Sequence, residues 1–229
     1  MLSNAGAINA ISLRVEAKPD HFSMRHNGDG TSGNRKEFFR SLGFDESSVV
    51  RGEQVHGDSI RLVDKPGNYP KTDGLVTKSK NLLLAISVAD CVSILITDKK
   101  SRTIAAVHAG WRGAAKRIMG KTIDFMVNEL SCDPRNVLAF VGPSAGVCCY
   151  EVGEEVAEHF RDGELIKSSK PRKFMLDLKA ANFSQLIDHG VPKENIEISE
   201  NCTIHDASFH SYRRDGTASG RMLAVIGVK

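Results

Sequence analysis

AAVHAGWRGAAKRI, residues 105–118, runs from a buried strand into a helix. Small and apolar residues lead into His108, a Gly-Trp-Arg-Gly turn follows, and a basic amphipathic run continues from there. The only Trp of the chain, Trp111, lies in this turn beside Arg112. In α/β folds, binding and catalytic residues gather where a buried strand ends. The stretch therefore predicts a functional turn at the junction of the strand and the helix.

Hydrophobic periodicity outlines the rest of the chain. A helix over 112–130 places five apolar residues and Thr122 on one stripe at helical spacing. LLLAISVADCVSILITD, residues 82–98, predicts two buried strands interrupted at Asp90 and Cys91. Strands and helices alternate too irregularly for a simple doubly wound sheet, so we expect mixed sheets with helices outside. Further strands are predicted over 10–17, 48–57, 103–110, 136–146, 194–203 and 221–229, and further helices over 34–44, 151–160 and 177–190.

Composition and charge are those of an ordinary soluble globular protein. The 229 residues are 41% hydrophobic and 26% charged, and the net charge of +3 is too small to indicate nucleic-acid binding. No apolar run reaches the ~20 residues of a membrane span, and the first residues lack the basic start of a signal peptide. Five cysteines, an odd number, argue against a secreted disulfide framework. We expect one cytoplasmic domain over 1–229 that binds neither nucleic acid nor membrane.

A Gly-x-Gly-x-x-Gly pattern at Gly28, Gly30 and Gly33 invites comparison with dinucleotide-binding loops. Those loops follow a buried strand, and their third glycine lies inside the next helix. Here the preceding residues are polar, and Asn34 as the helix N-cap would leave Gly33 outside the helix. We therefore interpret this segment as a flexible loop rich in Gly, Asp and Asn rather than as a dinucleotide site.

Two histidines and a cysteine stand near predicted strand ends: His56, Cys91 and His108. Each alone is more often a packed or hydrogen-bonded residue than a ligand. Together they offer two imidazole nitrogens and a thiolate, which leaves a fourth position open on a catalytic zinc. The same set also binds electron-transfer copper. The lack of a His-x-His pair in the sequence, and the placement of Cys91 and His108 on separate elements, weigh against copper.

Two further clusters stand out. Adjacent Cys148 and Cys149 could form a vicinal disulfide, bind a metal or supply a nucleophile, although the simpler interpretation is two half-buried thiols at a helix start. Arg213, Arg214 and Asp215 precede the last strand. We interpret this triplet mainly as a structural ion-pair and turn cluster, with anion binding as the lesser alternative.

Five motifs in a fixed order carry a resemblance to a known family: QVHG, ADC, VHAGWRGAAKRI, GPSAGVCCYEVGEEV and SYRRDGTASGRMLAVIG. The chain resembles the YfiH family, also called the multicopper polyphenol oxidase or laccase-domain family. Members of this family are described as purine nucleoside phosphorylases with adenosine deaminase activity. The resemblance extends over 22–229. It implies a four-layer αββα sandwich with mixed β-sheets, of the α+β class, shared with certain deamidating toxins.

The resemblance implies a zinc site made by His56 of QVHG, Cys91 of ADC and His108 of VHAGW, with Cu²⁺ as the alternative metal. A purine nucleoside (adenosine, inosine or methylthioadenosine) and phosphate would be bound beside it. For deamination the metal would activate water, and a carboxylate, Asp73 or Asp90, would move protons. The His-x-Glu and Pro-Cys-x-x-Cys signature of other zinc deaminases is absent from the sequence.

Further site residues follow from the same resemblance. Arg112 beside the start of a helix favours an anion such as phosphate, and Trp111 would pack beneath the turn or form a wall of the pocket. One segment, SMRHNGDGTSGNR, departs from the family pattern because it is short and has Asn27 where glycine is usual. Asn34 still matches the pattern. Substrate contacts are expected from Arg25, Arg35, Gln54 and Tyr150.

Three rival functions remain open at this point. A copper oxidase of phenols is suggested by one of the family's names. A thiol hydrolase would use Cys91 as nucleophile and His108 as its base, which competes with metal binding by the same residues. A non-catalytic metal-binding protein would hold metal without turnover. The zinc-dependent purine nucleoside enzyme ranks first among them.

Overall fold

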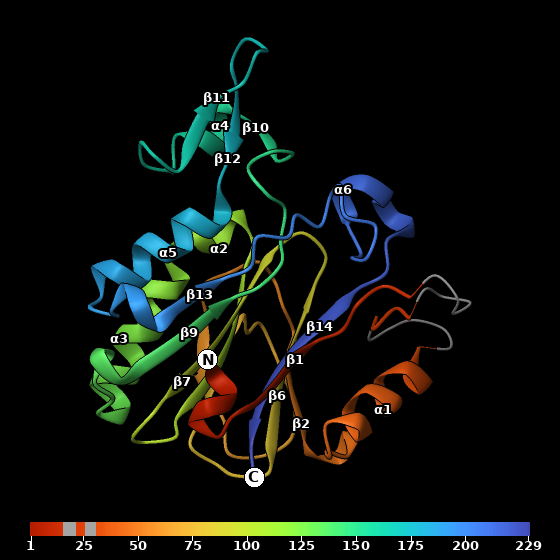
Figure 1. Cartoon of the computed structure of the whole chain (residues 1–229), viewed down its shortest axis with the longest axis vertical. Helices are drawn as coiled ribbons and strands as arrows, with labels where there is room; N and C mark the ends of the chain where they lie inside the picture. The colour runs from red at the N-terminus through yellow and green to blue at the C-terminus, as the bar shows by residue number, and fades with distance from the viewer. Residues whose placement is uncertain (16–21, 26–30) are drawn as a thin grey trace.

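Two mixed β-sheets form the body of the computed structural model, which describes residues 1–15, 22–25 and 31–229 (Figure 1). The five-stranded sheet has the order β1-β14-β6-β2-β4, and β2 pairs in parallel with both of its neighbours. The strands are β1 (Ile8–Ile11), β14 (Met222–Val228), β6 (Leu82–Val88), β2 (Val49–Gly52) and β4 (Gly67–Tyr69).

The six-stranded sheet has the order β13-β9-β7-β8-β5-β3, with antiparallel pairs at its centre and a parallel pair at each edge. Above it, a small antiparallel sheet of order β10-β12-β11 stands at one end of the molecule (Figure 1). The strands are β13 (Ile196–Ile198), β9 (Val137–Val141), β7 (Val92–Asp98), β8 (Ile104–Ala109), β5 (Gly74–Thr77), β3 (Ile60–Leu62), β10 (Glu151–Gly153), β12 (Lys173–Leu176) and β11 (Leu165–Lys167).

Helices cover the outer faces of the two sheets. Short 3-10 turns, η1 to η5, lie outside the strands and α-helices. The helices are α1 (Ser32–Ser41), α2 (Trp111–Ala115), α3 (Ile118–Leu130), α4 (Glu154–Ala157), α5 (Leu178–Asp188) and α6 (Tyr212–Asp215), and the turns are η1 (Leu2–Ala5), η2 (Glu46–Ser48), η3 (Pro134–Asn136), η4 (Lys193–Asn195) and η5 (Gly216–Ala218).

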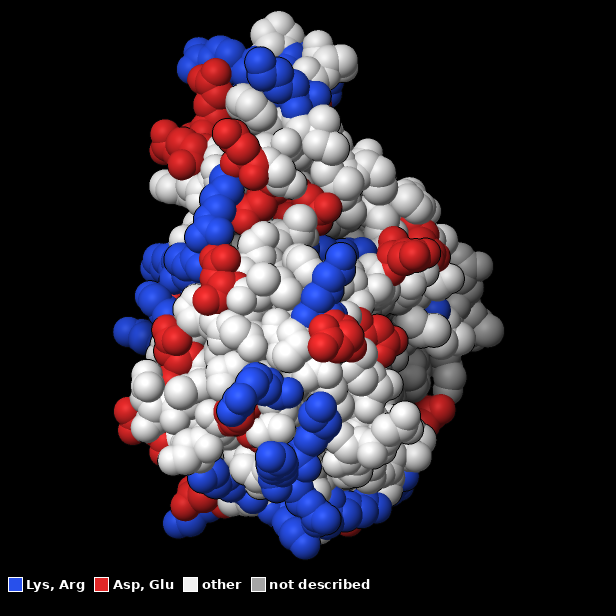
Figure 2. All heavy atoms as spheres, turned by 60° about the vertical axis from the view of Figure 1, so that its left-hand side comes forward, with Lys and Arg blue, Asp and Glu red and all other residues white. Residues whose placement is uncertain are grey.

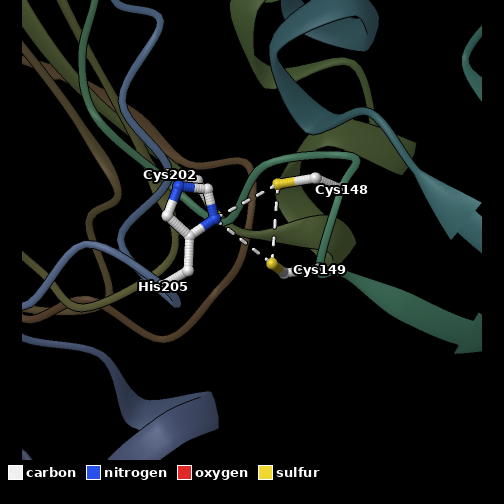
Figure 3. Close-up of side chains that lie close together, drawn as sticks. All are labelled: Cys148, Cys149, Cys202 and His205. Carbon is white, nitrogen blue, oxygen red and sulfur yellow. Dashed lines mark hydrogen bonds between the residues drawn. The ribbon is translucent and has the colours of Figure 1, made fainter.

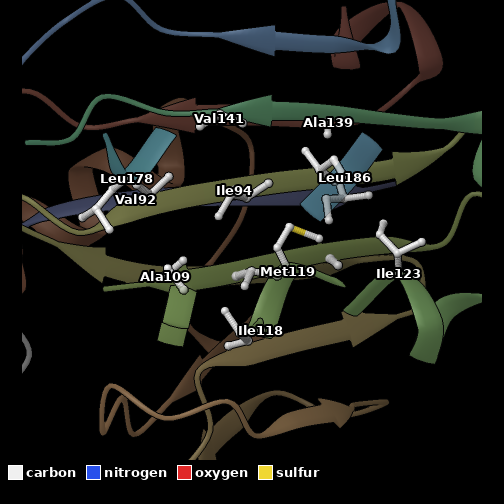
Figure 4. Packing of buried hydrophobic residues seen from close by; sticks show 14 of the residues in the cluster. Val92, Ile94, Ala109, Ile118, Met119, Ile123, Ala139, Val141, Leu178 and Leu186 are labelled. Atoms are coloured by element: carbon white, nitrogen blue, oxygen red, sulfur yellow. The ribbon is translucent and has the colours of Figure 1, made fainter. Parts of the chain in front are cut away.

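The structure has four layers, in the order helices, sheet, sheet and helix, and a cluster of buried apolar side chains lies between each layer and the next. Successive residues of β6 and β7 alternate between these clusters, so both strands are buried on both faces and have continuous apolar sequences. Leu84 and Leu95 lie in the cluster between the two sheets. Leu83 faces the cluster that includes Phe39 of α1, whereas Ile94 faces the cluster beneath α3 and α5 (Figure 4). The expected αββα sandwich with mixed sheets is confirmed.

The predicted helix over 112–130 is wrong in one respect, because the chain breaks it into α2 and α3. Arg117 adopts a left-handed conformation with φ of 60° between them. Gln185 of α5 satisfies polar groups on both sides of the break. Its amide nitrogen donates to the Ala114 carbonyl at 2.9 Å, and its oxygen accepts from the Gly120 N–H at 3.2 Å. A tertiary contact thus replaces helical hydrogen bonds that the periodicity alone predicts.

Other boundaries also differ from the predictions. β1 begins and ends earlier than the strand predicted over 10–17, of which residues 16 and 17 lie outside the described part. α1 begins at Ser32, so Gly33 and Asn34 lie inside the helix rather than before it; Gly28 and Gly30 lie outside the described residues. The helix predicted over 151–160 is a strand, β10, followed by one turn of helix, α4.

The surface carries charges of both signs. On the face that bears α3 and α5, Lys and Arg alternate with Asp and Glu, and Lys and Arg gather toward the lower end of the view (Figure 2). In the described ranges, every helix falls short of the length and apolar character that crossing a bilayer requires.

Candidate functional site

A cleft of about 880 Å³ opens where strands from both sheets end. The floor of the cleft is the link between β6 and β7, and β6 belongs to one sheet whereas β7 belongs to the other. The link between these strands, Ala89 to Cys91, therefore crosses between the sheets. The cleft is lined by Gly52, Glu53, Gln54, His56, Asn68, Ser87, Ala89, Asp90, Cys91, His108, Trp111, Arg112, Tyr150, Leu178, Tyr212, Arg213 and Arg221.

His56, Cys91 and His108 converge in this cleft. Their donor atoms all lie within 4.8 Å of one another. His108 is the penultimate residue of β8 and is 2% exposed, Cys91 lies half-buried in the crossover, and His56 follows β2 in an exposed loop. The two imidazole rings meet edge to face with their centroids 4.8 Å apart. Three residues that are far apart in the sequence thus offer a sulfur and two imidazoles to one point.

Asp73 organises both histidines from behind. Its side chain is fully buried, and one carboxylate oxygen accepts from His108 Nδ1 at 2.8 Å and from the His56 N–H at 3.1 Å. The other oxygen accepts from the N–H groups of Val55 at 3.2 Å and Gly57 at 2.8 Å. Burial opposes ionisation, but these hydrogen bonds outweigh it and lower the pKa of Asp73. The bond to Nδ1 directs His108 Nε2 toward the cleft.

Cys91 and His108 form a charged pair. Burial alone would raise the pKa of the Cys91 thiol, but the charge of His108 and hydrogen bonds from both histidines lower it to about 6. Burial would likewise lower the pKa of His108, but the Cys91 charge and the bond to Asp73 raise it to about 9. Near neutral pH the pair is therefore a thiolate and an imidazolium.

The crossover itself is held by Asp90, which has a positive φ of 83°. One carboxylate oxygen accepts from the Thr203 hydroxyl at 2.6 Å, and the other accepts from the Arg213 N–H at 2.6 Å. The Asp90 carbonyl accepts from the Ala145 N–H at 2.9 Å. These bonds fix the backbone that presents Cys91.

Three arginines line the cleft, and each lies over an aromatic ring that also lines it. The distances from guanidinium carbon to ring centroid are 4.3 Å for Arg112 over Trp111, 4.8 Å for Arg213 over Tyr150 and 5.7 Å for Arg221 over Tyr212. Such pairs hold a guanidinium in place. Arg213 also donates to the Glu151 carbonyl, and Arg221 donates to the carbonyls of residues 219 and 220, so an anion can meet only their remaining N–H groups.

Trp111 forms a wall of the cleft and contacts the segment that follows α4. Trp111 is half-buried against the core beneath α3 and stacks on His159, with centroids 6.4 Å apart and planes 19° apart. Both interpretations of Trp111 from the sequence therefore apply, because the ring packs inward and lines the cleft.

The expected substrate-binding residues separate into two groups. Gln54 and Tyr150 line the cleft, although both amide atoms of Gln54 bond to the Ser87 backbone. Arg25 and Arg35 are not among the lining residues. Arg25 donates to the carbonyls of residues 217 and 219, and buried Arg35 donates to the Arg25 carbonyl and the Thr31 hydroxyl.

Arg25 still influences the cleft through Arg221. Burial and the neighbouring charge of Arg25 lower the pKa of the Arg221 guanidinium. Sequence reasoning did not select Arg221 or Tyr212, although both lie in the quoted motif SYRRDGTASGRMLAVIG. The spacing of arginines and a tyrosine in that motif was the available signal. Arg214 and Asp215 form the predicted ion pair at 2.8 Å.

The donor set fits a catalytic zinc. Two imidazoles and one thiolate are a known three-ligand combination for that metal, and a carboxylate behind a ligating histidine is its usual support. The ionised Cys91 sulfur can bind a cation at this position, and the directed His108 Nε2 can do so when the metal displaces its proton. Copper accepts the same donors, so the geometry fits either metal.

A four-layer mixed α/β sandwich with a His-Cys-His cluster in an arginine-lined cleft defines the class of this protein. The chain belongs to the family described as multi-copper polyphenol oxidoreductase laccase, whose model matches residues 21–229.

Similar proteins agree with this assignment. The chain is 36% identical to the purine nucleoside phosphorylase YlmD of Geobacillus stearothermophilus, with 97% of this chain and 90% of that protein covered. It is 41% identical to a purine nucleoside phosphorylase of Deinococcus radiodurans, with 85% and 76% covered. The crystal structure of the Bacillus licheniformis hypothetical protein YfiH is 29% identical and gives a TM-score of 0.92 over 97% of this chain and 93% of that chain.

Proposed function

We propose that this protein is a zinc-dependent purine nucleoside phosphorylase that also deaminates adenosine. Its substrates would be adenosine, inosine or methylthioadenosine together with phosphate. The names of its relatives support the phosphorylase activity. The observation that carries the proposal is one cleft that holds the His-Cys-His cluster beside three arginines stacked on aromatic rings.

The residues suit the two halves of a nucleoside and a phosphate ion. Arg112, Arg213 and Arg221 provide N–H donors and positive charge for phosphate. Tyr150 lines the cleft beside Arg213 and provides apolar ring surface for a purine, whereas Trp111, covered by Arg112 and stacked on His159, forms a wall of the cleft. In phosphorolysis a phosphate oxygen attacks the ribose anomeric carbon, the bond to the purine nitrogen breaks, and the purine leaves with the electron pair and takes up a proton. Positioning of phosphate against that carbon is the contribution of the arginines.

His56, Cys91 and His108 would hold the zinc ion, which supplies Lewis-acid chemistry and activation of water when bound. In deamination water adds to the amino-bearing carbon of adenine and ammonia leaves, which requires a group that moves protons. Of the two carboxylates only Asp90 lines the cleft, beside Cys91, although its two oxygens accept hydrogen bonds from the Thr203 hydroxyl and the Arg213 N–H. Asp73 is engaged in four hydrogen bonds and would act as a positioning residue.

The test is product analysis by mass spectrometry with zinc-loaded protein and adenosine, with and without phosphate. We expect adenine and ribose 1-phosphate only when phosphate is present, and inosine from deamination in either case. His108→Ala should abolish both products. Arg112→Ala should raise the KM for phosphate about 10-fold or more, because a charge-assisted hydrogen bond contributes about 1.5–3 kcal/mol.

The controls separate loss of chemistry from loss of fold. Lys116→Ala changes an exposed cation at the end of the same short helix and should leave the KM for phosphate unchanged. A phosphate dependence that is identical in Arg112→Ala and in the unmodified protein would exclude the anion role. No product from adenosine, inosine or methylthioadenosine would exclude the proposed function, and oxygen uptake with copper-loaded protein and phenols would then test the oxidase.

A second function is favoured by the charged pair of Cys91 and His108. A thiolate beside an imidazolium is the activated state of thiol hydrolases and deamidases, and Asp73 orients the histidine as a third member. Iodoacetamide tests this alternative with metal-free protein and glutamine peptides as substrates. Amide hydrolysis that is lost on alkylation of Cys91, and absent when zinc is added, would favour the hydrolase.

A further inference from the structure

A second cluster of sulfur and nitrogen ligands lies outside the cleft. Cys148 and Cys149 come from the loop between β9 and β10, and Cys202 and His205 come from the loop between β13 and α6. Their donor atoms all lie within 4.8 Å of one another. Figure 3 shows the His205 ring directed at the sulfur atoms of Cys148 and Cys149. Three cysteines and one histidine form a Cys3His set, which is a common ligand set of structural zinc.

The spacing of these atoms fits one tetrahedral ion. Zinc bonds of about 2.3 Å to sulfur and about 2.05 Å to nitrogen place tetrahedral ligands about 3.8 Å apart for two sulfurs and about 3.6 Å apart for sulfur and nitrogen. The Cys148 and Cys149 sulfurs are 3.5 Å apart. His205 Nδ1 lies 3.6 Å from the first and 3.5 Å from the second. Little movement would be needed to bind the ion.

The fourth ligand is held by the backbone around it. Cys202 is buried, pairs with Ser144 in an isolated parallel bridge, and its sulfur accepts from the Gly146 N–H at 3.2 Å. A Cβ on Gly146 would lie 2.9 Å from Cys202 Cβ and 3.3 Å from the Cys148 sulfur. Glycine at this position lets the two loops approach closely enough for their sulfurs to meet.

Charge and access also suit a bound cation. Three thiolates around one Zn²⁺ leave a net charge of −1, and the ammonium group of Lys179 borders the same cavity. Lys179 is anchored there by the carbonyls of Ser199 at 2.6 Å and Asn201 at 2.7 Å. The cavity, of about 560 Å³, contains Cys148 and His205, which are both exposed. An ion can therefore reach the cluster from solvent.

We propose that Cys148, Cys149, Cys202 and His205 together bind one structural Zn²⁺ ion. All four coordination positions are filled by protein, so this site is closed to substrate, unlike the open His-Cys-His centre. The ion ties the loop that leads to Tyr150 to the loop that leads to Arg213. Because Arg213 lies over Tyr150, the site fixes the geometry of one wall of the cleft from outside it.

A vicinal disulfide is the competing state of Cys148 and Cys149. All five cysteines of the chain are free thiols, and the distance of 3.5 Å between these two sulfurs exceeds the disulfide bond length of about 2.05 Å. Oxidation of this pair would also remove two of the four ligands. The two states therefore exclude one another, and mass spectrometry separates them.

The experiment is a metal count by inductively coupled plasma mass spectrometry on full-length protein purified with zinc. Cys148→Ser/Cys149→Ser should lose about one zinc ion per chain, since four ligands bind a single ion. His205→Ala, a change at an exposed side chain, should lose the same amount without loss of fold. Cobalt-loaded protein should show intense visible bands and thiolate-to-cobalt charge transfer, of which both variants should lose the share of the Cys3His set and keep the share of Cys91.

Cys132→Ala is the matched control, because it removes a buried thiol that contacts Ser101 instead of the cluster. It should retain the full metal content. Cys91→Ser separates the two sites, since its loss of metal should leave the cobalt bands of the Cys3His set in place. Equal metal content in Cys148→Ser/Cys149→Ser and Cys132→Ala would overturn the proposal, as would a Cys148–Cys149 disulfide in zinc-replete protein. Neither result depends on enzymatic turnover.

Discussion

Asp73 shows how one side chain can orient candidate metal ligands without being one of them. Its two oxygens accept four hydrogen bonds, two of which fix the His108 ring and the His56 backbone. Burial of a carboxylate is costly unless every oxygen has partners, and here both oxygens have them. The negative charge also favours the cation that the three ligands would bind.

We expect Asp73→Asn to weaken zinc binding about 10- to 100-fold, because a carboxylate that hydrogen-bonds to a ligating histidine contributes that much to metal affinity. An asparagine has one acceptor oxygen, so its NH2 group would face backbone N–H donors that now bond to a carboxylate. Competition with a chromogenic chelator measures the affinity.

Asp64→Asn is the matched control for this prediction, because Asp64 is exposed on a loop. It should bind zinc as the unmodified protein does. Equal zinc affinity in Asp73→Asn and Asp64→Asn would show that the buried carboxylate contributes nothing to the centre.

The turn between β8 and α2 brings the backbone close to the candidate ligands. A Cβ on Gly110 would lie 3.0 Å from the Cys91 sulfur and 3.0 Å from a ring carbon of His56. Gly110 has a φ of −72°, which any residue can adopt, so its role is steric. The motif HAGWRG thus needs its first glycine for room beside the ligands.

We expect Gly110→Ala to displace Cys91 or His56 and to reduce bound zinc by at least about 10-fold, although no ligand is changed. Metal analysis after gel filtration measures the loss, and circular dichroism checks the fold. Gly33→Ala in α1 is the comparison, since no described atom lies within 4 Å of its Cβ position. It should keep its zinc. Normal zinc content in Gly110→Ala would contradict the steric argument.

Two ion pairs meet at the end of α5 and connect it with the break between α2 and α3 and with the segment after α4. Asp188, at the end of α5, lies 2.9 Å from both Arg117 and Arg161. Hydrogen bonds from these two arginines lower the pKa of Asp188. A carboxylate with a lowered pKa stabilises the fold above its unfolded pKa of about 3.9, and that stability is lost as pH falls through the folded pKa.

Asp188→Asn should therefore lower the Tm at pH 7 by a small amount, within about 4 °C, because exposed ion pairs contribute little. The difference should shrink below pH 4 and vanish once the carboxylate is protonated. Calorimetry from pH 2 to 7 measures it. Asp162→Asn, at a nearby exposed position, should show no such trend. A Tm difference that is constant across this range would rule out the ionised pair as its cause.

The long buried strands β6, β7 and β8 could be predicted from sequence because burial on both faces makes them continuously apolar, whereas the short buried strand β5 was not predicted. The breaks could not be predicted, since they depend on distant partners such as Gln185, which satisfies the polar groups between α2 and α3. The hairpin of β11 and β12 was missed because its strands are short, only partly buried and do not alternate clearly. The local pattern of apolar residues thus predicts an element only where a long element is uniformly buried.

The candidate ligands and Arg112 were foreseeable from their motifs, whereas the place of Arg221 in the cleft was not. Arg221 lines the cleft from the position just before the last strand, β14. It follows Arg112 in the chain by more than a hundred residues. Its partner Tyr212 reveals its role only through three-dimensional contact. The motif SYRRDGTASGRMLAVIG contains both residues, but a single sequence does not show that they reach the same cleft as Arg112.

The three residues of the His-Cys-His centre come from both sheets and from the link between them. His56 follows β2 of the five-stranded sheet, His108 lies on β8 of the six-stranded sheet, and Cys91 lies in the crossover between them. An ion bound to all three would cross-link the sandwich at one end. Metal binding to the folded state should therefore stabilise the packing of one sheet on the other.

We expect removal of zinc to lower the Tm by about 5–10 °C, since a ligand at 100 times its Kd contributes about 2.7 kcal/mol and a chain of this size gains about 2–4 °C per kcal/mol. The experiment uses Cys148→Ser/Cys149→Ser, so that only the centre between the sheets contributes. Calorimetry compares chelator-treated protein with protein to which zinc is restored.

Hydrogen exchange should locate the effect, with faster exchange after zinc removal around β2, the β6–β7 crossover and the end of β8, and unchanged exchange in α1. A variant with Cys91→Ser added to the same background should have a Tm that zinc does not alter. If zinc raises the Tm of both proteins equally, the stabilising ion binds elsewhere. If zinc raises neither Tm, the three ligands do not cross-link the sheets, because a cross-link between two packed layers must resist their separation.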